Sequence, residues 1–533
     1  MRARDASGNT EAASSRTFTY DTTTPQTTID SSPSDPTSST SADFDLSANE
    51  VGSTFECRLD GGAWGACASP AGYTSLTDGN HTFDVRAADP AGNTDGSPAS
   101  YTWLVDTAAP FSTIAFPAAS GEYNAAGWNA GCATSGTCGA YGDASGSGVD
   151  QVQVSVRRVS TGLYWNGAAF SAAAETFFSA SLAGGDWSRA FPASSFPADG
   201  DYTVRAFATD EAGNAETPMT RTFGFDATDP TGSLTAPADG SFVTGTLGVS
   251  SDSTDPGSGV DEAEFQRRPA GGGAWITIDT DSNAPYSVNW DTTPLADGDY
   301  DLRVLTTDAA GNTFTSPLRT VTVDNSAPSA PVVTLSESGP YAHVSGSEIF
   351  VNTDETGSYD VEAASSDAHS GIDKIRFPGP TDDSSSPYSA SYGLSDLAGA
   401  QTVTAFNGAG LTASSPFTVT PDTTEPTGGS VDYPNGYDAD GDVTISLDAG
   451  TDALSGIAAG SAVLERRTAP LADGTCDPFA GAWSAVTSPN AVASGLCAQY
   501  RYRVSDRVGN EAVSTSSNVV KVDLVAPSAP VLT

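Results

Sequence analysis

Short segments in which apolar and polar residues alternate recur along the chain. They open with an aromatic residue and continue with small or branched apolar residues at every second position: Phe83–Ala87, Tyr202–Ala206, Tyr300–Val304 and Tyr500–Val504. A period of two residues places the apolar side chains on one face of a β-strand. No segment combines a helical period with capping residues, so the pattern predicts an all-β fold.

A short turn motif follows each of these strands. It reads Asp-x-x-Gly-Asn; the aspartate side chain caps a turn, and the glycine accepts the positive φ angle of a hairpin. We expect it to join the last two strands of each repeat. The copies are Asp5–Asn9, Asp89–Asn93, Asp210–Asn214, Asp308–Asn312 and Asp506–Asn510, with a weaker form at Asn407–Leu411.

A second motif, Asp-x-x-x-Pro, divides the chain into units of similar length. Its prolines are Pro25, Pro110, Pro230, Pro328, Pro426 and Pro527, and consecutive copies lie 85 to 120 residues apart. One β-sandwich domain has about this size. The sequence therefore predicts five tandem modules at 25–109, 110–229 (with an insertion), 230–327, 328–425 and 426–526, preceded by the C-terminal hairpin of a truncated module at 1–24 and followed by the start of a further module at 527–533.

The two motifs together carry a family resemblance. Asp308–Asn312 followed by Val323–Pro328 resembles the bacterial Ig-like domains of giant surface adhesins and biofilm-associated proteins, and similar pairs cover nearly the whole chain. The aromatic residue that opens each penultimate strand resembles the tyrosine corner of immunoglobulin-like sandwiches. The module at 25–109 departs most, and its segment Phe55–Cys67 resembles another bacterial Ig-like subtype. The resemblance implies immunoglobulin-like β-sandwiches in an elongated string, with calcium at their joints.

The charge of the chain limits its partners. Acidic residues outnumber basic ones by 66 to 22, which gives a formal net charge of −44. Such a surface repels phosphate backbones and anionic membranes, so we expect no nucleic-acid partner. A surface that binds cations, or is simply well solvated, fits better. The two lysines are Lys374 and Lys521, and the arginines look scattered along strands such as Gln151–Arg158 rather than gathered into a patch.

Six cysteines form three pairs of near neighbours: Cys57 with Cys67, Cys132 with Cys138, and Cys476 with Cys497. None has the C-x-x-C spacing of zinc or redox sites. We expect disulfides within modules rather than buried free thiols, and therefore an extracellular or cell-surface location. No apolar run approaches the roughly 20 residues of a membrane-spanning helix, so an export signal or anchor is expected outside this stretch.

Catalytic chemistry has few possible positions in this sequence. One of the three histidines, His369, lies in Asp367–Asp373 beside a serine and carboxylates, but residues so close on one loop rarely form a catalytic triad. The motifs of serine hydrolases, zinc proteases, P-loops and dinucleotide sites are absent from the sequence. Asp438–Asp442 resembles the start of a calcium loop but lacks the glycine position and closing glutamate of an EF-hand. We expect no enzymatic activity.

Acidic residues near the module ends suggest a different chemistry. In an immunoglobulin-like sandwich, the last strand finishes at the end opposite to the B–C and F–G loops, so the final aspartate of one module faces those loops of the next. Converging carboxylates would repel each other unless a hard cation such as calcium neutralised them; alternatively, each aspartate only caps its own turn. The expected groups are Asp106 with Asp143 and Asp210; Asp226 with Asp252 or Asp255 and with Asp308; Asp324 with Asp367, where the hairpin offers Asn407; and Asp422 with Asp452 and Asp506.

These features favour a non-catalytic extracellular stalk or adhesive repeat region of a bacterial surface protein, which extends or presents a binding domain. Its ligand would be a cell-surface, matrix or polysaccharide component. The alternative is an Ig-like spacer or carbohydrate-binding region of a secreted multi-domain enzyme. Carbohydrate binding requires that Trp165 or Trp187 be exposed over a shallow groove; otherwise these aromatic residues belong to the core or to a strand edge.

Overall fold

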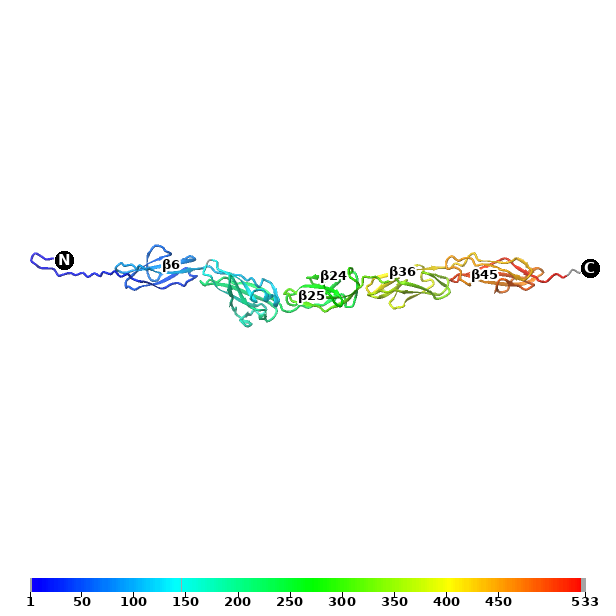
Figure 1. Cartoon of the computed structure of the whole chain (residues 1–533), viewed down its shortest axis with the longest axis horizontal. Helices are drawn as coiled ribbons and strands as arrows, with labels where there is room; N and C mark the ends of the chain where they lie inside the picture. The colour runs from blue at the N-terminus through cyan, green and yellow to red at the C-terminus, as the bar shows by residue number, and fades with distance from the viewer. Residues whose placement is uncertain (1, 145, 529–533) are drawn as a thin grey trace, which may run out of the picture.

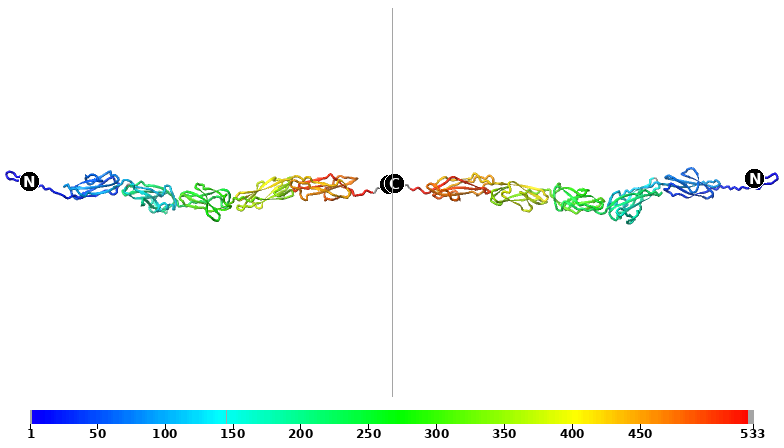
Figure 2. Two further views of the ribbon diagram at one scale, coloured as in Figure 1. Left: turned by 45° about the horizontal axis from the view of Figure 1, so that its top comes forward. Right: turned by 180° about the vertical axis from the view of Figure 1, so that it is seen from behind.

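The computed structural model describes residues 2–144 and 146–528. Five modules follow one another in a line from the N-terminus to the C-terminus (Figure 1), and the line persists when the molecule is turned by 45° or seen from behind (Figure 2). Among the described residues, the helical segments are α1 (Ala125–Ala130) and the 3-10 turn η1 (Ala193–Ser195), both in the second module. The predicted all-β fold of tandem immunoglobulin-like sandwiches is confirmed.

Each of the first two modules consists of two main sheets. In the first, β1 (Thr27–Ser31), β2 (Ala42–Ala48) and β5 (Ala71–Tyr73) face β4 (Gly65–Cys67), β3 (Thr54–Leu59), β6 (Gly79–Ala88) and β7 (Ala99–Val105). In the second, the smaller sheet is β15 (Ser181–Ala183), β16 (Asp186–Ala190), β10 (Gly136–Gly142) and β8 (Phe111–Ser112). Its larger sheet is β13 (Phe170–Ala172), β12 (Tyr164–Trp165), β11 (Val149–Arg158), β17 (Gly200–Asp210), β18 (Met219–Phe225) and β9 (Glu122–Tyr123), with β14 (Phe178–Ser179) beside β11.

The other three modules repeat this plan. The third has β19 (Leu234–Ala236), β21 (Thr246–Ser251) and β24 (Ser287–Asp291) in one sheet, and β20 (Phe242–Val243), β27 (Arg319–Val323), β25 (Gly298–Asp308), β22 (Val260–Pro269) and β23 (Ile276–Asp281) in the other, with β26 (Thr313–Thr315) beside β25. The fourth has β28 (Val332–Glu337), β31 (Ser358–Ala364) and β34 (Tyr388–Gly393), then β29 (Ala342–Ser345), β30 (Glu348–Val351), β36 (Thr412–Pro421), β35 (Gly399–Asn407), β32 (Ile372–Phe377) and β33 (Thr381–Asp383). The fifth pairs β37 (Ser430–Asp432) with β40 (Ser446–Asp448) and β39 (Asp442–Val443) with β44 (Asn490–Ala491). Its large sheet is β38 (Gly436–Asp438), β47 (Val520–Val522), β45 (Leu496–Ser505), β41 (Val463–Ala472) and β42 (Thr475–Cys476), with β43 (Ser484–Ala485) beside β41 and β46 (Glu511–Thr515) beside β45.

Every module has its own hydrophobic core, formed by one of five separate clusters. The predicted alternation is present in the penultimate strands: in β17, Tyr202 and Val204 are buried while Arg205 points outward. The hydroxyl of Tyr202 donates a hydrogen bond to the carbonyl of Ala198 at 2.6 Å, and β25 has the same arrangement at its first aromatic residue. This bond back to the preceding turn is the tyrosine corner, and it fixes the entry of the strand into the sheet.

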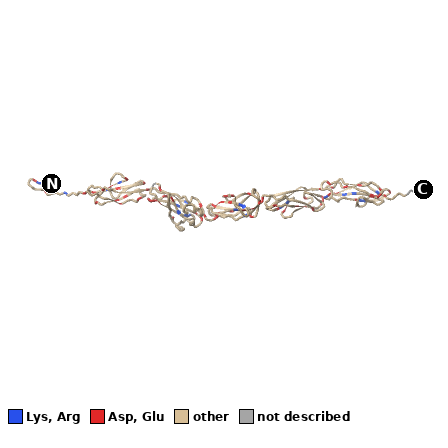
Figure 3. Cartoon of the chain, viewed as in Figure 1, with Lys and Arg blue, Asp and Glu red and all other residues tan. Residues whose placement is uncertain are grey.

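The arginines that look scattered in the sequence lie in pairs on the outer face of three modules. In the first module, the guanidinium groups of Arg58 and Arg86 lie over the ring of Trp64 at 4.6 and 4.4 Å from its centroid. Trp275 and Trp483 have equivalent pairs in the third and fifth modules. Each tryptophan ends a Gly-Ala-Trp segment, and strand register brings its two arginines together. Figure 3 shows basic residues within modules, between acidic module ends.

The three expected cysteine pairs are disulfide-bonded, with Cα–Cα distances of 5.8, 6.1 and 5.9 Å. Each disulfide lies within a single module. The predicted truncated hairpin at 1–24 appears, over residues 2–24, as a turn closed by the Arg4–Thr10 bridge and without a packed core, since Phe18 is 86% exposed. Of the predicted start of a further module, residues 529–533 lie outside the described residues.

Candidate cation sites at the module joints

Each joint is named here by the aspartate that follows the last strand of the preceding module. Asp106 follows β7, Asp226 follows β18, Asp324 follows β27 and Asp422 follows β36; all four are at least 98% buried. One carboxylate oxygen of each, Oδ1, accepts a hydrogen bond from the backbone N–H two residues later, at 3.0–3.2 Å. That oxygen therefore caps a local turn, as expected if each aspartate only caps its own turn.

The other oxygen, Oδ2, faces the next module. It accepts a hydrogen bond from the backbone N–H of a serine in the B–C loop: Ser147 at 2.7 Å, Ser258 at 2.7 Å, Ser370 at 3.2 Å and Ser455 at 3.1 Å. Each serine precedes the glycine of a Ser-Gly pair. The pair is therefore a part of the joint that the expected groups of acidic residues did not include.

The asparagine of the Asp-x-x-Gly-Asn motif closes the joint from the F–G hairpin. At the Asp226 joint, Asn312 Nδ2 donates to Asp308 Oδ2 at 2.8 Å within its own hairpin and to the carbonyl oxygen of Asp226 at 3.0 Å across the joint. Asn93, Asn214 and Asn510 make the same two contacts. The motif therefore links modules as well as forming a turn.

The carboxylates converge as the loop geometry predicts. In three joints the structure places one oxygen from each of three carboxylates within 4.8 Å of the others: Asp106, Asp143 and Asp210; Asp226, Asp255 and Asp308; Asp422, Asp452 and Asp506. Asp252, the other candidate at the Asp226 joint, lies apart and accepts a hydrogen bond from Ser233. Among the described residues two further groups converge: Asp21, Glu50 and Asp89, and, at the Asp324 joint, Asp297, Asp324 and His369. Glu50 was missed because the expected groups consisted of aspartates alone.

The electrostatics of these groups show their mutual repulsion. Burial, together with the charges of Asp226 and Asp308, raises the pKa of Asp255 above its ordinary value. Burial and the charge of Asp422 likewise raise the pKa of Asp506, although hydrogen bonds from Asn510 oppose the rise. Bringing carboxylates together without a counter-charge therefore costs free energy at these two joints.

The donor set at the Asp226 joint fits a hard divalent cation. Oδ1 of Asp255 is buried and has no hydrogen-bond partner, although buried carboxylate oxygens in proteins are normally satisfied. The three converging side chains offer only oxygen, the ligand that calcium prefers. The Asp106 and Asp422 joints have aspartates at the same three positions, so their residues fit a hard divalent cation as well.

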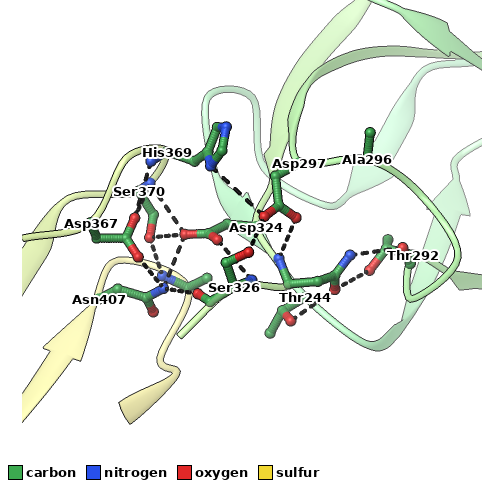
Figure 4. A network of polar contacts seen from close by, with 12 residues as sticks. Thr244, Thr292, Ala296, Asp297, Asp324, Ser326, Asp367, His369, Ser370 and Asn407 are labelled. Carbon is green, nitrogen blue, oxygen red and sulfur yellow. Dashed lines mark hydrogen bonds and ion pairs between the residues drawn. The ribbon is translucent and has the colours of Figure 1, made fainter. Parts of the chain in front are cut away.

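The Asp324 joint has a different donor set. The ligand atoms that converge there come from Asp297, Asp324 and His369, so a nitrogen takes the place of one oxygen and the all-oxygen set that calcium prefers is not formed. Figure 4 shows Asp324, Asp367 and Asn407 around a common centre, with the amide of Asn407 directed at both carboxylates. Asn407 Nδ2 donates to Asp324 Oδ2 at 3.0 Å and to Asp367 Oδ2 at 3.2 Å. The amide hydrogens therefore point where the other joints present a carboxylate oxygen.

The remaining candidate residues are two tryptophans of the second module and His369. Trp187 is 1% exposed and donates to the carbonyl of Thr113, so it belongs to the core. Trp165 is partly buried and packs edge to face on Phe170 and Phe191, with ring centroids 5.5 and 5.2 Å away. Trp187 therefore gives the carbohydrate-binding alternative no support, whereas Trp165 is neither fully buried nor exposed.

His369 lies at the Asp324 joint rather than in a triad. Its Nδ1 is 3.8 Å from Asp297 Oδ2 of the preceding module, while Ser370 Oγ donates to Asp324. The serine hydroxyl is thus engaged by an aspartate and not by the histidine. Within residues 2–144 and 146–528, no helix has the length and hydrophobicity to cross a lipid bilayer.

Comparisons with known proteins agree with this architecture of repeated β-sandwiches. A family described as bacterial Ig domain matches residues 230–304, one described as bacterial Ig-like domain matches 116–227, and one described as bacterial Ig-like domain (group 3) matches 284–384. The last match crosses the Asp324 joint. The chain therefore contains bacterial Ig-like domains in tandem.

Solved structures give a weaker likeness. The fibronectin(III)-like modules of Clostridium thermocellum CbhA are 19% identical, with 36% of this chain and 95% of that chain covered and a TM-score of 0.25. A tetra-tandem repeat from the extending region of a large adhesion protein is 18% identical, with 75% and 100% covered and a TM-score of 0.22. No curated protein matches the chain. TM-scores this low say nothing about function.

Proposed function

We propose that this chain is a non-catalytic extracellular stalk or adhesive repeat region of a bacterial surface protein, which extends or presents a binding domain. The observation that carries the proposal is the repeated bonding between modules. At the Asp106, Asp226 and Asp422 joints, a buried aspartate of one module is bonded by a serine N–H and an asparagine amide of the next. Flexible linkers do not need such bonds, whereas an extended spacer does.

The reach of the string follows from its strands. A strand of 11 residues, such as β17 or β25, spans about 36 Å at ~3.3 Å per residue. Five modules in line would then extend over roughly 180 Å. The net charge of −44 supports a partner other than nucleic acid, and the three disulfides support an oxidising, extracellular compartment.

Calcium is proposed as a stiffener of the acidic joints. The Asp106, Asp226 and Asp422 groups would hold it, since each joins one carboxylate of the preceding module to two of the following module. A bound cation would neutralise the repulsion between these carboxylates and resist bending, because bending would separate its ligands. The cation would have no part in catalysis.

Small-angle scattering of the full chain tests the proposal. With calcium we expect a rod, and after chelation a smaller maximum dimension, as the acidic joints loosen. Calorimetry under the same conditions should detect calcium binding. A compact or randomly bent particle in both conditions would contradict the stalk. A rod of unchanged length that binds no calcium would keep the stalk and leave these aspartates as turn caps.

The compartment is tested by free-thiol titration of protein that is unfolded without reductant. We expect no reactive thiol, because all six cysteines are paired. Reactive thiols in protein purified from its native source would contradict an oxidising compartment.

A further inference from the structure

The Asp324 joint differs from the Asp226 joint at two positions of the F–G hairpin: it has Asn407 and Leu411 where the Asp226 joint has Asp308 and Asn312. Asp308 at the Asp226 joint and Asn407 at the Asp324 joint occupy the same place in the F–G hairpin, where Oδ1 accepts the N–H four residues later at 2.7 and 2.8 Å. This shared bond fixes the orientation of the Asn407 amide. Its Nδ2 must then stand where Asp308 has Oδ2.

The Asn407 amide makes contacts that elsewhere require two residues. At the Asp226 joint, the crossing bond to the preceding module comes from Asn312. The equivalent of Asn312 is Leu411, which has no amide, and Asn407 Nδ2 itself donates across the joint to the carbonyl of Ser326 at 3.0 Å. Together with its bonds to Asp324 and Asp367, this amide has three acceptors around it.

We propose that the Asn407 amide takes the place of a bound cation and makes the Asp324 joint independent of calcium. At the three matching positions the joint has two carboxylates where its neighbours have three, and both accept hydrogen bonds from the same NH2 group. A further carboxylate, Asp297, lies beside Asp324 and His369 and accepts a hydrogen bond from Ser326. A cation placed between them would face the amide hydrogens and would have to break these bonds. The string therefore contains joints of two kinds, acidic joints that a cation tightens and one joint that is closed by the chain itself.

The pKa shifts around the Asp324 joint agree with the proposal that the Asn407 amide takes the place of a cation. Burial acts to raise the pKa of Asp367, but hydrogen bonds, led by that of Asn407, hold it below its ordinary value. Asp255, at the matching position of the Asp226 joint, has its pKa raised instead. Asp297 and Ser326 of the preceding module also face Asp324, Asp367 and Asn407. The Ser326 hydroxyl donates a hydrogen bond to Asp297, and His369 lies 3.8 Å from the same carboxylate.

An exchange of the two residue pairs in the full chain tests the inference, which rests on the proposed calcium sites of the acidic joints. One variant, N407D/L411N, gives the Asp324 joint the Asp…Asn pair of its neighbour. The reciprocal variant, D308N/N312L, gives the Asp226 joint the Asn…Leu pair. Both combinations already occur in this fold, so each variant is expected to fold.

Hydrogen exchange measured by mass spectrometry reads the joints one by one, with calcium chloride and with chelator. In the wild type, peptides over 367–372 and 405–411 should be equally protected in both conditions, whereas peptides over 255–260 and 307–312 should lose protection with chelator. N407D/L411N should make the Asp324 joint sensitive to calcium and add one ion to the calorimetric stoichiometry. D308N/N312L should abolish the sensitivity of the Asp226 joint and remove one ion.

Failure of this inference and failure of the calcium proposal give different results. If calcium protects the Asp324 joint of the wild type as strongly as the others, Asn407 does not replace a cation, and the inference is wrong. If no wild-type joint responds to calcium, the calcium proposal fails. The replacement inference would fail with it unless N407D/L411N creates a calcium-sensitive joint, which would show that the amide blocks a site there.

Discussion

The Asp226 and Asp324 joints are built from the same elements and differ in how their charges are balanced. Both place a fully buried aspartate against a B–C loop serine and an F–G hairpin. The Asp226 joint gathers three carboxylates and leaves Oδ1 of Asp255 without a partner, whereas the Asp324 joint has an amide between two carboxylates. The exchange of Asp308 and Asn312 for Asn407 and Leu411 thus distinguishes a joint that needs a counter-charge from one that has its own hydrogen-bond donor.

The largest expected effect comes from Gly257→Ala, which should open the Asp226 joint alone. A Cβ at position 257 would lie 2.3 Å from Asp226 Oδ2, so the aspartate must move and lose its bond to Ser258. We expect a cost of about 1–3 kcal/mol, typical of overpacking. Hydrogen exchange of 255–260 measures it. Gly248→Ala is the control, since a Cβ there meets nothing within 4 Å; equal effects of both variants would refute the explanation.

A smaller loss is expected from Asn312→Ala. The variant removes the bond across the joint to the Asp226 carbonyl and the bond to Asp308 Oδ2. The expected cost is about 1 kcal/mol for each bond lost. Protection of 307–312 should fall, while that of the Asp324 joint stays constant. Asn289→Ala, at an exposed position of β24, serves as control; unchanged protection in Asn312→Ala would mean that the asparagine does not hold the joint.

When calcium is absent, acid should change the stability of the two joints in opposite directions. Burial and neighbouring carboxylates raise the pKa of Asp255, so stability at the Asp226 joint should increase as the pH falls through that raised value. The pKa of Asp367 is lowered by hydrogen bonds that outweigh burial, so its stabilisation is present above its unfolded pKa and is lost as the pH falls through the folded one. Hydrogen exchange followed from neutral pH to below the ordinary aspartate pKa of 3.8, corrected for intrinsic rates, measures both. A change of the same sign at both joints would contradict this assignment.

The smallest effect is expected from His369→Ala at the Asp324 joint. Its contact with Asp297 is 3.8 Å long and the histidine side chain is 39% exposed. Exposed ion pairs contribute below about 1 kcal/mol. Thermal unfolding should therefore change little, and calcium-independence of the joint should persist. A joint that becomes calcium-sensitive in this variant would show that the histidine, and not Asn407, replaces the cation.

The motifs predicted which acidic residues converge at the joints, because their places in the module follow from the topology of the sandwich. In each immunoglobulin-like sandwich the last strand finishes at the end opposite to the F–G hairpin, so stacking the modules brings Asp226 at the end of the second module onto Asp308 in the hairpin of the third. The choice between Asp252 and Asp255 stayed open, since the two differ by three residues on one loop and only the backbone path separates them. Glu50 was not anticipated, because the expected pattern contained aspartates alone.

Some features had signals in the sequence that were not interpreted. The Gly-Ala-Trp segments end at Trp64, Trp275 and Trp483, and each has two arginines on nearby strands. Strand pairing sets each arginine opposite Asp84, Glu56 or an equivalent residue, and so brings two guanidinium groups against one indole ring. Which strands pair, and in which register, cannot be obtained from one strand at a time.

The sequence by itself determined the strands, the hairpins, the cysteine pairs and the residues that gather at each joint, because alternation and turn chemistry depend on neighbours along the chain. The tertiary structure decided which atoms of those residues meet. Asn407 differs from Asp308 by one atom in the sequence. That this atom donates to Asp324 and Asp367 follows from the hairpin bond to Leu411, which turns the amide toward the preceding module. Its role depends on distances between two modules, and these are set when the modules pack end to end.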